Sequence, residues 1–202
     1  MRKLLAIAAT VAALGTVSAA HAEGSAEAGQ TKAAVCAACH GPDGNSANPE
    51  WPSIAGQHAD YLVSQLKAFK SGDRQNVLMS PMAMPLSEQD MEDLAAWFAS
   101  QTPTPREADP ALVEKGQRLY RGGDAERGIA ACIACHGPNG QGNPLAGYPV
   151  IAGQHATYAA QALKAYRAGE RRSDANQMMR NVSANLSDED IRALASYVQG
   201  LR

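Results

Sequence analysis

The sequence "VCAACHGPDGN" at residues 35–45 places two cysteines three positions apart, with a histidine directly behind the second one. The sequence "ACIACHGPNGQ" at 131–141 repeats this arrangement almost letter for letter. Together the two segments contain all four cysteines of the chain and one histidine behind each pair: Cys36, Cys39 and His40, then Cys132, Cys135 and His136. Any interpretation of the cysteines must therefore account for the histidines as well.

Several kinds of site use closely spaced cysteines, and most of them fit poorly here. Two disulfides would leave the histidines unexplained, and a thioredoxin-like motif belongs in a strand–helix–strand pattern that the sequence lacks. Structural zinc needs four ligands, whereas each segment offers three. Cys-x-x-Cys-His is the attachment pattern of c-type haem, in which the thiols add to the porphyrin vinyl groups and the histidine binds iron. The sequence therefore predicts two covalent haem c groups, attached at Cys36 and Cys39 and at Cys132 and Cys135, with His40 and His136 as iron ligands.

The first 22 residues have the pattern of a secretory signal peptide. Two basic residues at 2–3 precede an apolar run at 4–17, and "AHA" at 20–22 gives a small-x-small cleavage site. The apolar run is short for a membrane span. We expect cleavage after residue 22, export to the periplasm, and a mature chain without a transmembrane segment. A retained membrane anchor is the alternative.

The remainder of the chain is an internal duplication. The segment "WPSIAGQHADY" (51–61) returns as "YPVIAGQHATY" (148–158), and "LSEQDMEDLAAWF" (86–98) returns as "LSDEDIRALASYV" (186–198). A proline-rich segment separates the copies. We predict a signal peptide at 1–22, an N-terminal haem-binding domain at 23–102, a linker at 103–109 and a C-terminal haem-binding domain at 110–202.

Each copy is predicted to be helical. Helices are expected near 25–38 and 109–123, and middle helices with one apolar face at 58–71 and 155–168. A last helix should begin after Ser87 and after Ser187, because an aspartate three residues later resembles a capping box. The prediction is an all-α fold of two tandem domains. With Cys-x-x-Cys-His near its start and a terminal helix at its end, each domain resembles a class I cytochrome c, which implies a chain wrapped around one covalent haem.

The second axial ligand of each iron is expected to be a methionine. Counting back from the last helix of each copy pairs Met79 with Met179, and we favour these two. The second copy has three more residues than the first between the middle and last helices, and a different placement of this insertion would bring in Met82 or Met178 instead. Met91 is expected to fill the apolar core.

The repeated "AGQH" and the repeated prolines admit more than one role. His58 and His155 are interpreted as helix-start or surface histidines near the haem, with bis-histidine coordination as the alternative. Pro52 and Pro149 could offer a backbone carbonyl to the ring N–H of the iron-binding histidine, or could simply stiffen the loop.

The order of these motifs resembles the dihaem cytochrome c4 family over essentially the whole mature chain. The resemblance implies two His/Met-coordinated irons, domains whose haem edges face each other, and electron transport in the periplasm toward a terminal oxidase. The family's methionines fall on Met79 and Met179, although the extra methionines of "MSPMAM" (79–84) depart from the pattern.

With both axial positions filled, neither iron has a free position for a substrate. We therefore expect an electron carrier of a respiratory chain and not an enzyme. The expected partners are membrane-bound complexes, namely a terminal oxidase and a quinol:cytochrome c reductase. The protein itself is expected to be a monomer that is at most loosely associated with the membrane. The alternative is a dihaem oxidoreductase, peroxidase-like or acting on sulfur compounds, with one displaceable axial ligand.

Charge differs between the two copies. Residues 23–105 contain 10 acidic and 4 basic residues, whereas residues 106–202 contain 10 acidic and 12 basic ones. Such an asymmetry orients a molecule toward charged partners and makes docking rates depend on salt. No basic cluster indicates nucleic-acid binding, and no basic amphipathic helix indicates membrane insertion.

Overall fold

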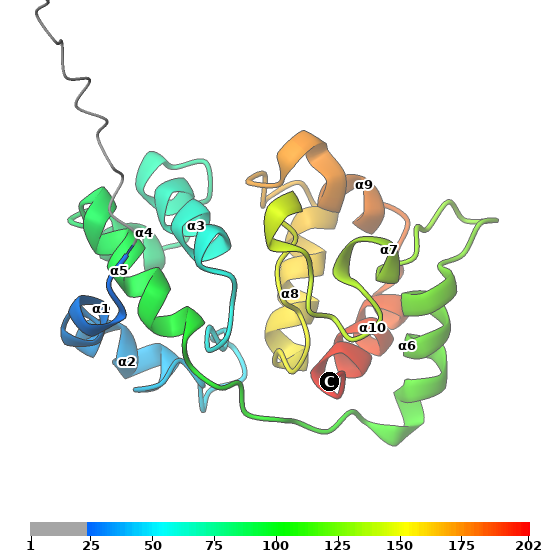
Figure 1. The fold of residues 1–202 in the computed structure, drawn as a ribbon. Coiled ribbons are helices and arrows are strands. Elements are labelled where there is room, and N and C mark those ends of the chain that lie inside the picture. Colours follow the sequence, from blue (N-terminus) through cyan, green and yellow to red (C-terminus); the bar gives the residue numbers. More distant parts are fainter. Residues whose placement is uncertain (1–23) are drawn as a thin grey trace, which may run out of the picture.

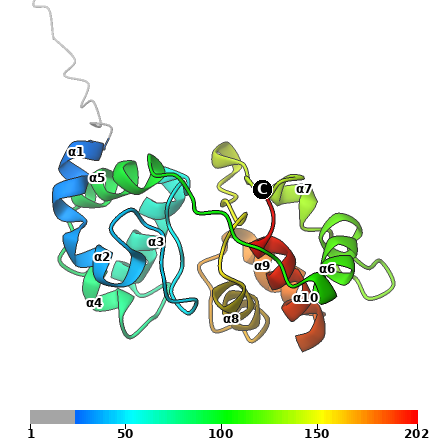
Figure 2. The same ribbon diagram turned by 90° about the horizontal axis from the view of Figure 1, so that it is seen from below.

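The computed structural model describes residues 24–202. The predicted signal peptide lies outside these residues. The described chain forms two helical bundles side by side, joined by an extended segment that runs along both (Figures 1 and 2). No helix in residues 24–202 is both long and apolar enough to cross a membrane.

In the first bundle, the other helices pack around the last helix of that bundle. Its elements are α1 (Ala26–Lys32), α2 (Ala34–His40), α3 (Ala59–Ser71), α4 (Met79–Ala83) and α5 (Glu88–Ala99). Helices α1 and α3 both pack on α5. The core is formed by buried apolar side chains of these elements: Ala33, Leu62, Leu94, Ala95 and Phe98. The predicted helix near 25–38 is interrupted at Ala33, which ends α1 and precedes α2.

The second bundle repeats this arrangement. Its elements are α6 (Pro110–Gly122), α7 (Ile133–His136), η1 (Pro144–Ala146), α8 (Ala156–Arg167), η2 (Ala175–Gln177), α9 (Met178–Ser183) and α10 (Asp188–Gln199). Helices α6 and α8 both pack on α10. Residues 24–202 contain two isolated β-bridges and no strand. The all-α fold of two tandem domains is confirmed.

The last helix of each bundle begins with a capping box, as predicted. Ser87 Oγ accepts the Asp90 N–H at 3.1 Å, and the Asp90 carboxylate accepts the Ser87 N–H at 2.9 Å. Ser187 and Asp190 make the same pair of bonds, at 3.1 and 3.0 Å. These bonds satisfy N–H groups that the first turn of a helix leaves without partners.

Glycines allow the first helix of each bundle to approach the last one closely. A Cβ on Gly29 would lie 2.0 Å from the Asp93 carbonyl oxygen, and a Cβ on Gly116 would lie 2.4 Å from the Ala193 oxygen. Gly29 and Gly116 are 87 positions apart, whereas the cysteines are 96 apart, so the second copy has nine extra residues between its first helix and its cysteines. The segment 123–132 that follows α6 is a turn closed by a bridge between Asp124 and Ile129.

Candidate haem-binding sites

The two predicted iron-binding histidines are held in the same way. His40 is the last residue of α2 and His136 the last of α7, and both are buried. The Nδ1 of His40 lies 2.8 Å from the Pro52 carbonyl oxygen, and the Nδ1 of His136 lies 3.0 Å from that of Pro149. The prediction that both prolines offer a backbone carbonyl to the ring N–H of the histidine is confirmed.

These bonds determine which ring nitrogen is available to a metal. A carbonyl oxygen only accepts hydrogen bonds, so Nδ1 carries the proton and the lone pair is on Nε2. Burial lowers the pKa of His40 and of His136, although the carbonyl contact opposes this in part. The neutral imidazole, which is the form that binds a metal, is therefore favoured at both positions.

The cysteines lie next to these histidines, and none of the four takes part in a disulfide within the described residues. Cys36 and Cys39 are three positions apart on α2 and so share one side of the helix. Cys132 immediately precedes α7, and Cys135 is within it. Burial raises the pKa of Cys36, and it raises that of Cys132 to about 11. Thiols of this kind are poorly ionised at neutral pH, which does not suit a redox motif that depends on a reactive thiolate.

The predicted axial methionines lie on the short helices that precede the last helix of each domain. Met79 begins α4 and Met179 lies in α9, and both side chains are half-buried. Of the alternatives, Met82 is 48% exposed, and the Sδ of Met178 accepts a hydrogen bond from the Tyr148 hydroxyl at 3.9 Å. Met91 is buried in the core, as predicted.

The donor set fits a haem better than a bare metal ion. Within residues 24–202, no group of three or more His, Cys, Asp or Glu side chains is arranged to hold a metal ion. Each domain instead offers two thiols and one oriented imidazole beside an apolar wall. Cys36 and Ile54 pack on the core of the first domain, and Cys132 and Ile151 on that of the second. A planar apolar group attached through the thiols suits such a wall.

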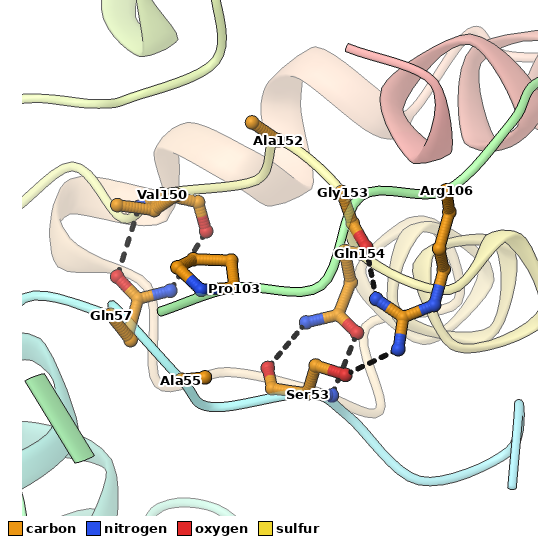
Figure 3. Close-up of a pocket in the computed structure, with 9 residues that line it drawn as sticks. All are labelled: Ser53, Ala55, Gln57, Pro103, Arg106, Val150, Ala152, Gly153 and Gln154. Carbon is orange, nitrogen blue, oxygen red and sulfur yellow. Dashed lines mark hydrogen bonds between the residues drawn. The ribbon is translucent and has the colours of Figure 1, made fainter. Parts of the chain in front are cut away.

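The repeated "AGQH" joins the two domains. The amide of Gln57 donates to the Val150 carbonyl at 2.8 Å and accepts the Val150 N–H at 2.9 Å. The amide of Gln154 makes the equivalent bonds to Ser53, at 2.8 and 2.9 Å (Figure 3). The contact thus has an approximate two-fold symmetry that matches the duplication.

The histidines of the same motif also cross the interface. His58 and His155 are the N-cap residues of α3 and α8, which confirms the helix-start interpretation. The Nε2 of His58 is 2.8 Å from the Gln141 carbonyl oxygen, and the Nε2 of His155 is 2.8 Å from that of Ser46. These bonds favour an interface role over the bis-histidine alternative. This role was not predicted from the sequence, although the near identity of "AGQH" in both copies is what a two-fold contact requires.

The linker takes part in the same interface through Arg106. Its guanidinium donates to the Gly153 carbonyl at 2.7 Å in one domain and to Ser53 Oγ at 3.0 Å in the other (Figure 3). It also donates to the Ser46 carbonyl of the first domain at 3.2 Å. Asn45 holds the linker as well, through Thr102 and Thr104. The linker is therefore bound to both domains along its length.

Comparisons with known proteins agree with this geometry. The family model described as cytochrome c matches residues 26–102 and 113–202. A cytochrome c4 of Stutzerimonas stutzeri is 50% identical over 198 residues, which cover 93% of this chain and 94% of that protein. The crystal structure of reduced recombinant cytochrome c4 from Pseudomonas stutzeri superimposes with a TM-score of 0.86 at 49% identity, covering 89% of this chain and 100% of that one. A thiosulfate dehydrogenase electron acceptor of Stutzerimonas stutzeri (strain A1501) is 39% identical over 170 residues, 82% of this chain and 78% of that protein.

Proposed function

This chain belongs to the cytochrome c4 family, and from that premise we propose that it carries electrons in the periplasm from a quinol:cytochrome c reductase to a terminal oxidase. Each of its two cytochrome c domains binds one haem c, an iron porphyrin that is attached covalently. Proteins of this family transfer electrons and are not enzymes. We take the domains as 23–102 and 110–202, with the linker at 103–109.

We assign the roles at each haem as follows. Two cysteines would attach the porphyrin, and a histidine and a methionine would bind its iron: Cys36, Cys39, His40 and Met79 in the first domain, and Cys132, Cys135, His136 and Met179 in the second. When bound, the haem supplies an iron that alternates between the ferrous and ferric states. The chain would supply the two axial ligands of each iron.

The observation that carries this proposal is the pair of carbonyl contacts on the histidines. Pro52 and Pro149 fix the ring planes of His40 and His136 through Nδ1, at 2.8 and 3.0 Å. A ligand held in this way keeps its orientation and its proton while the charge on the metal changes. Small rearrangement on gaining or losing an electron is what a carrier needs, and the same arrangement occurs in both domains.

The location and partners rest on other features. The pattern of residues 1–22 supports export to the periplasm. The mature protein is proposed to be a monomer, at most loosely associated with the membrane complexes that it serves. The relative whose name describes an electron acceptor of thiosulfate dehydrogenase favours an oxidoreductase of sulfur compounds as a second class of electron donor.

The test is electron delivery by the purified mature protein. We expect the reduced protein to be oxidised by membranes that contain a terminal oxidase, with oxygen consumption that stops when the protein is left out. Reduction by quinol:cytochrome c reductase, and separately by a thiosulfate dehydrogenase, distinguishes the two donors. Rapid stoichiometric binding of carbon monoxide to one reduced haem would contradict the proposal, because it would show a displaceable ligand.

A further inference from the structure

The histidine of each proposed haem site is connected to the opposite domain through a single peptide group. Pro52 and Ser53 share one peptide unit, whose carbonyl oxygen lies 2.8 Å from the Nδ1 of His40. The N–H at the other end of this unit donates to Oε1 of Gln154 at 2.9 Å. His40 belongs to the first domain and Gln154 to the second. The peptide unit therefore links a proposed iron ligand to a side chain of the other domain.

The second domain contains the same connection in the opposite direction. The carbonyl oxygen of Pro149 lies 3.0 Å from the Nδ1 of His136. The N–H of Val150, in the same peptide unit, donates to Oε1 of Gln57 at 2.9 Å. We call the connection from His40 to Gln154 the first relay and that from His136 to Gln57 the second relay. Each relay begins in one domain and ends in the other.

The orientation of each glutamine amide follows from its neighbours. Oε1 of Gln154 accepts the backbone N–H groups of Ser53 and His155, while Nε2 donates to the Ser53 carbonyl at 2.8 Å. The amide of Gln57 is held by three equivalent bonds. Because an N–H only donates, the atom that faces each relay is the oxygen. Each relay thus ends on an acceptor that is fixed by two backbone N–H groups.

The opposite domain supplies the only acceptor that the described residues offer to these two peptide N–H groups. Within residues 24–202, the Ser53 N–H bonds to Gln154 alone and the Val150 N–H to Gln57 alone. The next N–H group in each loop bonds instead to a carbonyl oxygen of its own domain, at 2.7 and 2.8 Å. Each relay therefore depends on contact between the domains.

A peptide group transmits polarisation from one of its ends to the other. When its N–H is hydrogen-bonded, its carbonyl oxygen becomes more negative and accepts more strongly, by about 10–30% per bond. A stronger bond at Nδ1 draws the proton away from the imidazole and makes Nε2 a more basic ligand. A more basic ligand stabilises ferric iron relative to ferrous iron, which lowers the reduction potential. The acceptor at the end of each relay is therefore placed to influence the iron of the other domain.

We propose that Gln154 is a positioning residue for the iron site of the first domain and Gln57 for that of the second, each lowering the reduction potential of the haem in the opposite domain. This inference rests on the two-haem site of the proposed function. Each glutamine acts through a peptide group and a histidine. Because the relays cross, each potential depends on contact between the domains.

Redox titration of the mature holoprotein, followed at each haem by the NMR signals of its methyl groups, tests the crossing. Q154M removes the amide acceptor at similar side-chain size, so it should raise the potential of the first haem and change that of the second much less. Q57M should raise the potential of the second haem and change that of the first much less. Y158F controls for a loosened interface, because it removes the cross-domain bond from Arg74 and touches neither relay. Its potentials should stay near the wild-type values.

The hydrogen bond at the histidine is measured by proton NMR of the reduced holoprotein, in which low-spin ferrous haem is diamagnetic. Loss of the acceptor weakens the bond from Nδ1, so the Nδ1–H signal of His40 should move upfield in Q154M while that of His136 stays in place. Q154E keeps an oxygen that can accept the Ser53 N–H, so in this variant the His40 signal should not move upfield. A role of Gln154 in interface stability alone would leave the His40 signal unchanged in Q154M.

Other results would overturn the proposal. A shift confined to the haem of the mutated domain, equal shifts of both haems, or potentials that stay unchanged in Q154M and Q57M contradict crossed relays. If Q57M fails to fold because Gln57 is buried, Q154M carries the same test, since Gln154 is more exposed. The potentials are measured without a partner protein, so their outcome is independent of whether the protein delivers electrons to an oxidase.

Discussion

Gln57 and Gln154 stand at equivalent positions of the two copies, and each makes the same two hydrogen bonds to the backbone of the opposite domain. Gln57 bonds to Val150 at 2.8 and 2.9 Å, and Gln154 bonds to Ser53 at 2.8 and 2.9 Å. A side-chain amide is suited to this contact because it donates and accepts at once, as a neighbouring β-strand would. The relationship holds one domain against the other through paired hydrogen bonds between side chain and backbone.

Gln57→Ala is expected to loosen this interface. It removes two hydrogen bonds and leaves the Val150 N–H and carbonyl without partners, at a cost of about 1–3 kcal/mol. Urea unfolding followed by the haem spectra, together with the radius of gyration from small-angle scattering, should show a less stable and more extended pair of domains. Gln75→Ala, at an exposed position in the same domain, is the control. Equal stability of the two variants would contradict the prediction.

Met79→Ala is expected to change the first iron site, whereas Met82→Ala is not. Met79 is half-buried and is proposed to bind iron, and Met82 is 48% exposed on the same short helix. Loss of the thioether should remove the weak far-red methionine-to-iron band of one haem and lower its potential. Spectra and redox titration of both variants decide this. If the band survives in Met79→Ala and is lost in Met82→Ala, Met82 and not Met79 is the iron ligand.

Gly116→Ala is expected to destabilise the second domain strongly. The added Cβ would lie 2.4 Å from the Ala193 carbonyl oxygen and 2.6 Å from the Tyr197 Cβ, so α6 must move away from α10. Overpacking of this kind costs about 1–3 kcal/mol. Gly122→Ala, at the end of the same helix, is the matched control, because its Cβ meets nothing within 4 Å. Equal thermal unfolding temperatures of the two variants would contradict this packing.

Asp93→Asn is expected to remove part of the acid sensitivity of the first domain. The hydrogen bond from Lys32 and that from the Ser25 N–H lower the pKa of Asp93 from 3.8 to about 2. A carboxyl group whose pKa is lowered by folding stabilises the fold at pH values above its ordinary pKa. This stabilisation is lost as the pH falls from 3.8 toward 2. The variant should be less stable at neutral pH, and its stability should fall less steeply in this range.

The matched control for Asp93 is Asp60→Asn, which removes an exposed carboxylate at the beginning of α3. Stability should be measured by denaturant unfolding of both variants across the acid range. If Asp93→Asn keeps the full acid dependence of the wild type, the pairing of Lys32 with Asp93 is not the cause.

Local patterns allowed much of this molecule to be predicted from the sequence. The capping boxes at Ser87 and Ser187 depend on an aspartate three residues away, and the carbonyl contact of His40 reaches only twelve residues along the chain, to Pro52. The interruption at Ala33 was not predicted, because the propensities of an alanine-rich stretch do not show where α1 must turn to cover α5.

The sequence by itself determined the duplication and the helical class, and it pointed to the residues that we propose to attach and orient two haems, because motifs such as Cys-x-x-Cys-His and the capping boxes depend on neighbours within a few turns. Only the tertiary structure decided what "AGQH" and Arg171 contact. His155 meets Ser46 at a separation of 109 residues, and Arg171 meets Tyr61 at a separation of 110. Contacts of this kind leave no local pattern, since they exist only once the second domain packs against the first.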